Sequence, residues 1–230
     1  TVTGELLTID AADTNLSLTL IGTKGTGTNL HEGVSGRTYT WFASDAASPF
    51  VTGGAFDFNW YLTNNALATP THVLFNLGIN DGFSSTTDPA LNTAWYAAKT
   101  YIDTMLTNIM AVVPTAKVAL CLPVPGAYSQ DASGNNYGVS TTRLRYQRNM
   151  LLWANLLIAS YGGRTAEGLY VVPISVAINP EYGYPYASAT PVASRITSVT
   201  VTRMNNLVHP NTEGYYQIAE MMWAWLKNVL

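Results

Sequence analysis

Charged side chains are scarce in this sequence. Of its 230 residues, only 11% are Asp, Glu, Lys or Arg, less than half the usual share of about 25%. The net charge is −3 and no basic run occurs, which argues against nucleic acid as a partner. No apolar run reaches the roughly 18 residues of a membrane span. The surface must be rich in Thr, Ser, Asn and Tyr, so we expect a secreted, extracellular or phage-borne protein.

Cysteine is almost absent as well. Cys121 is the only one, which excludes an intrachain disulfide and a zinc site built on several cysteines. It lies in the apolar stretch 118–122, so we expect it to be a small buried hydrophobic residue.

The pattern of apolar residues predicts alternating strands and helices. Hydrophobic residues make up 47% of the chain, enough for a sizeable core. Periodicity and breaker residues predict strands at 16–20, 73–77, 118–122 and 169–174, helices at 3–12, 89–113, 141–161 and 211–229, and irregular segments at 22–36, 123–138 and 179–200. This alternation indicates an α/β fold with a mostly parallel sheet. We see no repeat or linker, so residues 1–230 are expected to form a single domain.

The stretch "LFNLGINDGF" (74–83) places polar groups where a predicted strand ends. In parallel sheets, ligands bind beyond the carboxyl ends of the strands. There Gly78 would let the chain turn, Asn80 would offer an amide donor, and Asp81 would brace the following loop. The alternative for Asn80 is an ordinary Asx turn.

A second candidate loop runs through Gly33, Val34, Ser35 and Gly36. Glycine allows a backbone N–H to approach a ligand closely, so this loop and Asn80 together could stabilise an oxyanion. Ser35 is a poor candidate nucleophile. A nucleophile elbow needs glycine where Arg37 stands, and no predicted strand runs into Ser35.

His209 is the candidate general base. It lies just before the last predicted helix, beside the rigid Pro210 and the capping residue Asn211. A histidine held in this way is suited to proton transfer. The alternative is a histidine that only forms hydrogen bonds in a loop. For His31 and His72 we expect structural roles.

Three stretches together resemble conserved blocks of the SGNH (GDSL-type) hydrolase family: "HEGVSGRT", "LGIND" and "NLVHPNTEGY". Each is short, but their order and spacing extend the resemblance over nearly the whole chain. The resemblance implies oxyanion-hole roles for Gly36 and Asn80 and a base at His209. It also implies a flavodoxin-like three-layer α/β/α sandwich with a parallel sheet of strand order 2-1-3-4-5. Members of the family hydrolyse esters, and many remove acyl groups from carbohydrates; no metal or other cofactor is implied.

The sequence departs from the family at the nucleophile. The Gly-Asp-Ser block at the end of the first family strand is absent, and residues 1–10 resemble the helix that follows it. We therefore expect strand 1, with the nucleophilic serine, upstream of residue 1 or on a separate N-terminal fragment. Without it, the sheet should show an open edge and an apolar slot.

A second departure concerns the partner of the histidine. The family aspartate would stand three residues before His209, where this chain has Asn206. Asn206 could orient the imidazole through its amide oxygen, as in Cys-His-Asn enzymes, or a Ser-His dyad could use another acceptor. The neutral amides of Asn205, Asn206 and Asn211 around the histidine favour the dyad.

The sequence therefore predicts a serine ester hydrolase that acts through an acyl-enzyme on short acyl esters, such as O-acetyl groups of carbohydrates. Arg37 and Tyr184 are expected to bind substrate, and Tyr182, Tyr184 and Tyr186 could stack on a sugar ring. The alternative is a non-catalytic carbohydrate-binding or structural domain on the same fold, which Asn206 and the missing nucleophile would favour. A flavodoxin-like cofactor binder is disfavoured, since no glycine-rich phosphate loop appears.

Overall fold

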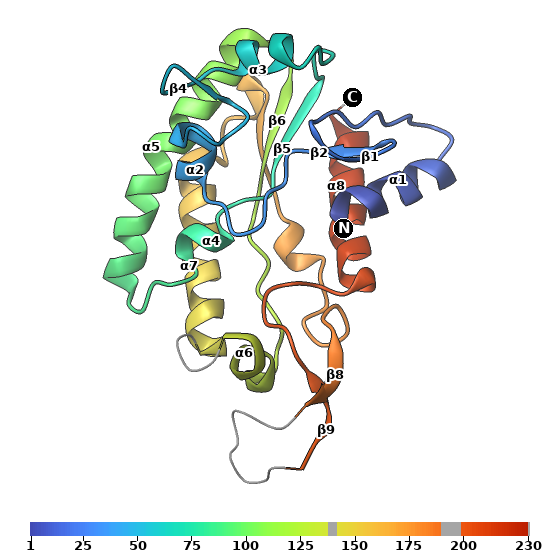
Figure 1. Cartoon of the computed structure of the whole chain (residues 1–230), viewed down its shortest axis with the longest axis vertical. Helices are drawn as coiled ribbons and strands as arrows, with labels where there is room; N and C mark the ends of the chain where they lie inside the picture. The colour runs from blue at the N-terminus through green and yellow to red at the C-terminus, as the bar shows by residue number, and fades with distance from the viewer. Residues whose placement is uncertain (138–141, 190–198, 230) are drawn as a thin grey trace.

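The computed structural model describes residues 1–137, 142–189 and 199–229. Its centre is a parallel sheet of order β5-β6-β7, formed by β5 (His72–Phe75), β6 (Lys117–Cys121) and β7 (Leu169–Val172) (Figure 1). β6 is the central strand, and four of its five residues are buried. This sheet confirms the predicted α/β class.

Helices cover both faces of the sheet. Helices α5 (Asp88–Val112) and α7 (Arg143–Tyr161) pack on the face that carries Val118 and Leu120. Helix α8 (Thr212–Asn228) packs on the face that carries Ala119 and Cys121, with α1 (Val2–Ala12) against it. The arrangement is compatible with the expected three-layer sandwich. Cys121 is fully buried, as predicted.

Shorter elements extend the loops around this core. They are β1 (Lys24–Thr26) with β2 (Asn29–His31), α2 (Tyr39–Ser44), β3 (Val51–Thr52) with β4 (Ala55–Phe56), α3 (Phe58–Asn64), α4 (Ile79–Gly82), α6 (Gln130–Tyr137), the 3-10 turns η1 (Thr165–Glu167) and η2 (Ile174–Val176), and β8 (Tyr186–Ala189) with β9 (Val201–Met204). Among the residues described, no helix is both long and apolar enough to span a bilayer.

The four long helices begin and end close to the predicted positions because strong caps fix them. The caps of α1, α5, α7 and α8 are Thr1, Thr87, Thr142 and Asn211, whose side chains each accept a backbone N–H from the first turn. Three segments that were predicted to be irregular contain short helices or strands. Residues 22–36 contain the β1-β2 hairpin, residues 123–138 contain α6, and the described part of 179–200 contains β8.

The strand predicted at 16–20 is wrong. Leu16 and Leu18 are half-buried against the core, but no strand forms there. Alternating apolar residues predict a strand only where a neighbouring strand supplies hydrogen bonds. Here α1 and the segment after it lie beside α8, where Asp13 accepts hydrogen bonds from Trp223 and Lys227.

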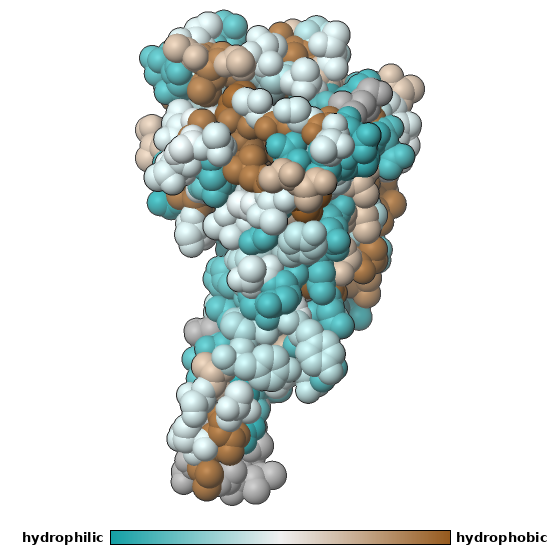
Figure 2. Space-filling view, turned by 90° about the vertical axis from the view of Figure 1, so that its right-hand side faces the viewer, coloured by the Kyte–Doolittle hydropathy of each residue, from teal (hydrophilic) through white to brown (hydrophobic). Residues whose placement is uncertain are grey.

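Strand β5 has an open edge. Among the described residues it pairs only with β6, and all four of its residues are half-buried. Apolar surface is more extensive in the upper part of the face shown in Figure 2 than in its middle part. The expectation that a further strand belongs beside β5 stays a prediction. The three observed strands fit positions 3-4-5 of the expected order, and the rest of that order stays a prediction.

A left-handed turn at Gly78 directs the chain from β5 into α4. Its φ is +102°, and a Cβ at this position would lie 2.5 Å from Nε1 of Trp153, a fully buried side chain. Glycine is therefore required for both its conformation and its size.

We expect Gly78→Ala to lower the free energy of unfolding by about 2–4 kcal/mol, from backbone strain and overpacking. The matched control is Gly53→Ala, at φ +58° with nothing within 4 Å of the added Cβ. It should cost only the strain, about 1 kcal/mol. Urea unfolding of both variants measures the difference, and equal losses would contradict the role assigned to Trp153.

Candidate active site

The carboxyl ends of the parallel strands gather the predicted site segments. Helix α4 follows β5, and the loop 205–211 approaches the same end of the molecule from β9 (Figure 1). This is the position at which open α/β sheets bind ligands.

Gly36 lies in an exposed turn before α2. Its φ is +73°, and no atom lies within 4 Å of a Cβ built there. The N–H of Arg37 donates to the carbonyl of Val34 at 3.4 Å, which closes the turn. Thr38 then caps α2 by accepting the N–H of Trp41 at 3.1 Å. The turn is thus fixed from its helix side, and Gly36 stays open to solvent.

Asn80 and Asp81 hold this turn from the side of α4. The Asn80 amide donates through Nδ2 to the carbonyl oxygen of Arg37 at 3.0 Å. The Asp81 carboxylate accepts the N–H of Tyr39 at 3.1 Å. Residues 80–81 are thus joined to residues 37–39, more than 40 positions earlier in the sequence, by hydrogen bonds to two neighbouring peptide groups. Nδ2 carries two hydrogens, so one remains available to a ligand.

The position of Asp81 has an electrostatic cost. Burial raises the pKa of Asp81 to about 6 from 3.8, although the N–H groups of Tyr39 and Asp81 itself oppose the rise. Sequence reasoning expected Asp81 to brace the loop that follows it, but its carboxylate contacts the start of α2 instead. This contact joins residues that are distant in the sequence, so the local sequence pattern could not predict it.

His209 is oriented by two neighbours. Its Nδ1 lies 3.3 Å from Oδ1 of Asn206 and 3.4 Å from the hydroxyl of Tyr137. Asn206 Oδ1 also accepts the backbone N–H groups of Val208 at 3.0 Å and His209 at 2.8 Å. These donors identify the atom facing the imidazole as the amide oxygen. Nδ1 therefore faces an acceptor, and the tautomer with its proton on Nδ1 would leave the lone pair of Nε2 for a base.

The loop that carries His209 is anchored on both sides. The carbonyl of Leu207, a fully buried residue, accepts the N–H of Ala127 at 2.9 Å. Oδ1 of Asn211 caps α8 by accepting the N–H of Gly214, and its Nδ2 donates to the carbonyl of Tyr182 at 2.8 Å. The amide of Asn211 is thus used in capping and loop anchoring, whereas Asn206 contacts the imidazole.

Aromatic contacts connect the two halves of the site. Phe83, directly after α4, lies 5.0 Å from the ring of Tyr137 between centroids. Tyr137 in turn contacts Asn206 and His209. The chain of contacts runs from the block of Asn80 to the base. The distance between Asn80 and His209 themselves stays a prediction. Tyr137 was not predicted as a site residue, because it ends α6 in a segment that was predicted to be a loop.

The two residues expected to bind substrate differ in exposure. Arg37 is exposed, and its guanidinium lies over the ring of Trp41, 4.7 Å from the centroid. Tyr184 is completely buried, so its ring has no face open for stacking on a sugar. The exposed aromatic residues of this region are its neighbours Tyr182 and Tyr186.

His31, His72 and Ser35 were not expected to act in catalysis, and each lies outside the contacts described above. Nδ1 of His31 accepts the N–H of Gly33 at 3.0 Å, within one turn. His72 packs its ring edge-on against Trp225, and burial followed by the charge of Lys117 lowers its pKa. These contacts agree with the structural roles expected for both. Ser35 lies in the exposed turn before Gly36, and no strand leads into it.

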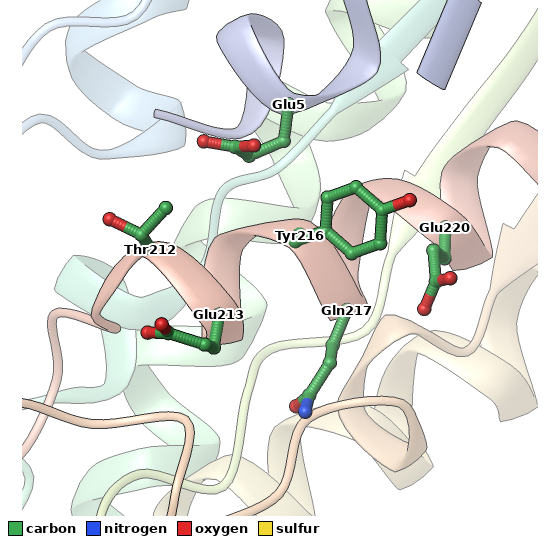
Figure 3. Close-up of a pocket in the computed structure, with 6 residues that line it drawn as sticks. All are labelled: Glu5, Thr212, Glu213, Tyr216, Gln217 and Glu220. Atoms are coloured by element: carbon green, nitrogen blue, oxygen red, sulfur yellow. The ribbon is translucent and has the colours of Figure 1, made fainter. Parts of the chain in front are cut away.

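A cavity of about 430 Å³ lies away from these residues. Figure 3 shows its lining: Glu5 projects from α1, and Thr212, Glu213, Tyr216, Gln217 and Glu220 from α8. None of the predicted site residues lines it, and its carboxylates form no described group of three potential metal ligands.

No protein-family model and no curated protein matches the chain. Several solved structures have a similar fold. A carbohydrate esterase of family 3 from Talaromyces cellulolyticus is 18% identical, with 99% of this chain and 88% of that one covered and a TM-score of 0.49. A protein assigned as an arylesterase from Agrobacterium tumefaciens is 16% identical, with 87% and 80% covered and a TM-score of 0.48.

A third structure, assigned as a GDSL-like lipase from Parabacteroides merdae, is 14% identical, with 75% and 66% covered and a TM-score of 0.39. This chain therefore spans about two thirds of that protein. At these identities and scores the likeness says nothing about function, so the function proposed below is derived from this chain's own residues.

The burial of Asp81 gives a prediction about stability. Its folded-state pKa of about 6 lies above 3.8, so the folded protein binds this proton more tightly than the unfolded chain. Wild-type stability should therefore fall as the pH rises through this window. An asparagine at position 81 would still offer an oxygen to accept the N–H of Tyr39, but its side chain would not titrate.

We expect Asp81→Asn to gain stability relative to wild type between pH 4 and pH 7, by up to about 3 kcal/mol. Urea unfolding across this range measures the gain. Asp45→Asn is the matched control, since Asp45 is an exposed carboxylate that also accepts a backbone N–H. A stability difference for Asp81→Asn that does not change with pH would contradict the buried, titrating carboxylate.

Proposed function

We propose that this chain carries the base and two oxyanion donors of a serine ester hydrolase. The observation that carries the proposal is the hydrogen bond from Asn80 to the carbonyl of Arg37, which brings the Asn80 amide beside the Gly36 turn. An exposed N–H at Gly36 and the second Asn80 hydrogen supply two donors suited to a developing oxyanion. The oriented imidazole of His209 supplies the base.

The nucleophile in this proposal is a serine on a strand that pairs with the open edge of β5. Such a strand comes from a preceding segment of the same polypeptide or from a separate fragment. It would end beside α4, which follows β5 directly. Its pairing would satisfy the unpaired backbone groups at that edge.

The proposed reaction has two steps. The serine oxygen attacks the acyl carbonyl carbon while its proton passes to Nε2 of His209, and the resulting oxyanion is held by Gly36, Asn80 and the serine N–H. The bond to the alcohol oxygen then breaks, and His209 returns the proton to that oxygen. Water attacks the acyl-enzyme with His209 again as base, and the carboxylic acid leaves. The residues require no metal or other cofactor for this reaction.

We propose short acyl esters as substrates, with O-acetyl groups of carbohydrates as the substrate class, and an extracellular location. Arg37 on Trp41 is proposed to form part of the substrate-binding wall. The second candidate function is non-catalytic carbohydrate binding, which is favoured by the neutral amide of Asn206 at the base. A fluorophosphonate probe separates the two: an adduct in the intact mass of the full-length natural protein supports the enzyme, and its absence supports the binder.

We expect His209→Ala to lower the turnover of p-nitrophenyl acetate by several orders of magnitude, about 10⁶ in the comparable serine-protease case. Asn80→Ala should lower it by about 10²–10³, as for one oxyanion donor. His31→Ala is the matched control and should keep wild-type turnover. Turnover of His209→Ala within about tenfold of wild type would remove this residue from the reaction.

The surroundings of Asn206 predict the effect of a carboxylate there. The Oδ1 position already receives two backbone N–H groups and lies beside Nδ1 of His209, so a carboxylate would find donors rather than an apolar site. It would also stabilise the imidazolium formed in each step. These contacts favour Asn206 as the third member of a triad-like arrangement over the dyad that the sequence favoured.

We expect Asn206→Asp to raise kcat by about tenfold or more, equivalent to about 1.4 kcal/mol of barrier. Asn205→Asp, one position away, is the matched control and should give no such rise. Turnover measured across pH for the three proteins provides the test. An unchanged or lower kcat for Asn206→Asp would mean that the site is adapted to a neutral partner.

A further inference from the structure

Three exposed tyrosines lie close to the loop that carries His209. Their exposed fractions are 46% for Tyr128, 65% for Tyr182 and 46% for Tyr186. Tyr128 comes from the segment after β6, Tyr182 comes from the segment between η2 and β8, and Tyr186 is the first residue of β8. Burial raises the pKa of Tyr186, as do the nearby charges that Tyr128, Glu181 and Tyr182 would carry. The hydroxyl of Tyr186 reaches the carbonyl of Glu181, next to Tyr182, and the N–H of Tyr128 donates to the carbonyl of Pro180, so the three residues lie on neighbouring backbone segments.

Hydrogen bonds hold the backbone of these residues in place. The N–H of Tyr128 donates to the carbonyl of Pro180 at 3.0 Å, which ties the two segments together. Asn179 Oδ1 accepts the N–H groups of Glu181 at 2.8 Å and Tyr182 at 3.0 Å. The hydroxyl of Tyr186 donates to the carbonyl of Glu181 at 3.3 Å. The rings are therefore presented by an ordered turn, which reduces the entropy lost when a ligand binds.

The same turn is attached to the segment around the proposed base. Residue Tyr186 pairs with Met204 in the β8-β9 ladder, and the N–H of Asn205 donates to the carbonyl of Pro185 at 3.0 Å. The N–H of Asn211 donates to the carbonyl of Gly183, also at 3.0 Å. His209 lies between these two attachment points. A ligand seated on the tyrosines would therefore lie on the turn to which the His209 loop is attached on both sides.

The chemistry of the patch suits a neutral, hydroxylated ring. A tyrosine offers a flat apolar face for the C–H face of a sugar and a hydroxyl for hydrogen bonds at its rim. Its side chain has few rotatable bonds, so little entropy is lost on contact. Charges of both signs border the patch, since Glu181 lies beside Tyr182 and the Arg143 guanidinium donates to the carbonyl of Tyr128, so the tyrosine faces themselves suit a neutral ligand.

We propose that Tyr128, Tyr182 and Tyr186 form a saccharide-binding subsite that holds the sugar portion of an ester substrate beside His209. That the bound sugar belongs to an ester substrate rests on the proposed function. Saccharide binding itself does not depend on hydrolysis. It replaces the buried Tyr184 with its exposed neighbours as the aromatic contacts. It also assigns the preference for carbohydrate esters to particular residues.

The test compares two substrates and one ligand, using the full-length protein. The variants are Tyr182→Ala and Tyr186→Ala, with Tyr182→Phe to keep the ring face. Tyr96→Ala is the matched control, since Tyr96 is 66% exposed but lies on α5. The substrates are p-nitrophenyl acetate and acetylated xylo-oligosaccharide, and the ligand is deacetylated xylo-oligosaccharide in calorimetry.

We expect each alanine variant at the patch to raise KM for the acetylated oligosaccharide by about tenfold and to weaken calorimetric binding by the same factor. Turnover of p-nitrophenyl acetate should not change, and both Tyr182→Phe and Tyr96→Ala should resemble wild type. Oligosaccharide binding that is absent from wild type, or equal in wild type and both alanine variants, overturns the subsite. Wild-type binding without any ester hydrolysis overturns the proposed function and leaves the subsite standing.

Discussion

The candidate site depends first on how two adjacent side chains hold a distant stretch of backbone. Asn80 donates to the carbonyl of Arg37, and Asp81 accepts the N–H of Tyr39, so the peptide groups on either side of Thr38 are both fixed to α4. Gly78 makes this possible because its left-handed conformation turns the chain at the end of β5. A buried carboxylate with a raised pKa is an unfavourable way to anchor a helix start. The contact it makes is local and specific, which is consistent with a site whose geometry matters more than its stability.

His209, the proposed base, is held by a different kind of contact. One amide oxygen, Oδ1 of Asn206, accepts two backbone N–H groups and lies beside Nδ1 of His209. The backbone donors fix the direction of the Asn206 amide, and the amide in turn selects the tautomer of the imidazole. Tyr137 lies within 3.4 Å of both side chains, so the orientation does not depend on Asn206 alone. An amide in this position orients the ring without adding charge, in contrast to the carboxylate of a serine-protease triad.

The sequence pattern predicted those features that depend on residues close together in the chain. The helices at 89–113 and 211–229 were recognised from their apolar spacing and their caps, because both signals lie within the element itself. The turn at Gly78 and the exposure of Gly36 also follow from short sequence signals. The strand expected at 16–20 does not form because a strand needs a partner, and none of the described strands pairs with this segment. Helix α6 was missed because its sequence, with two Asn and a Gly, has little helical preference. Its residue Tyr137 was consequently missed as a contact of the base.

The two halves of the site belong to different faces of one sheet. Val34 and Trp41, on either side of the Gly36 turn, pack with Val73 and Phe75 in the core beneath α5 and α7. Leu207 and Val208, beside the base, pack with Leu74 in the core beneath α8. Successive residues of β5 thus point into the core that supports each half, since side chains alternate across a strand. The block of Asn80 follows the carboxyl end of β5, whose other edge pairs with no strand among the described residues. In the proposed function, the strand added at this edge brings the serine to the carboxyl end of β5, where α4 with Asn80 begins.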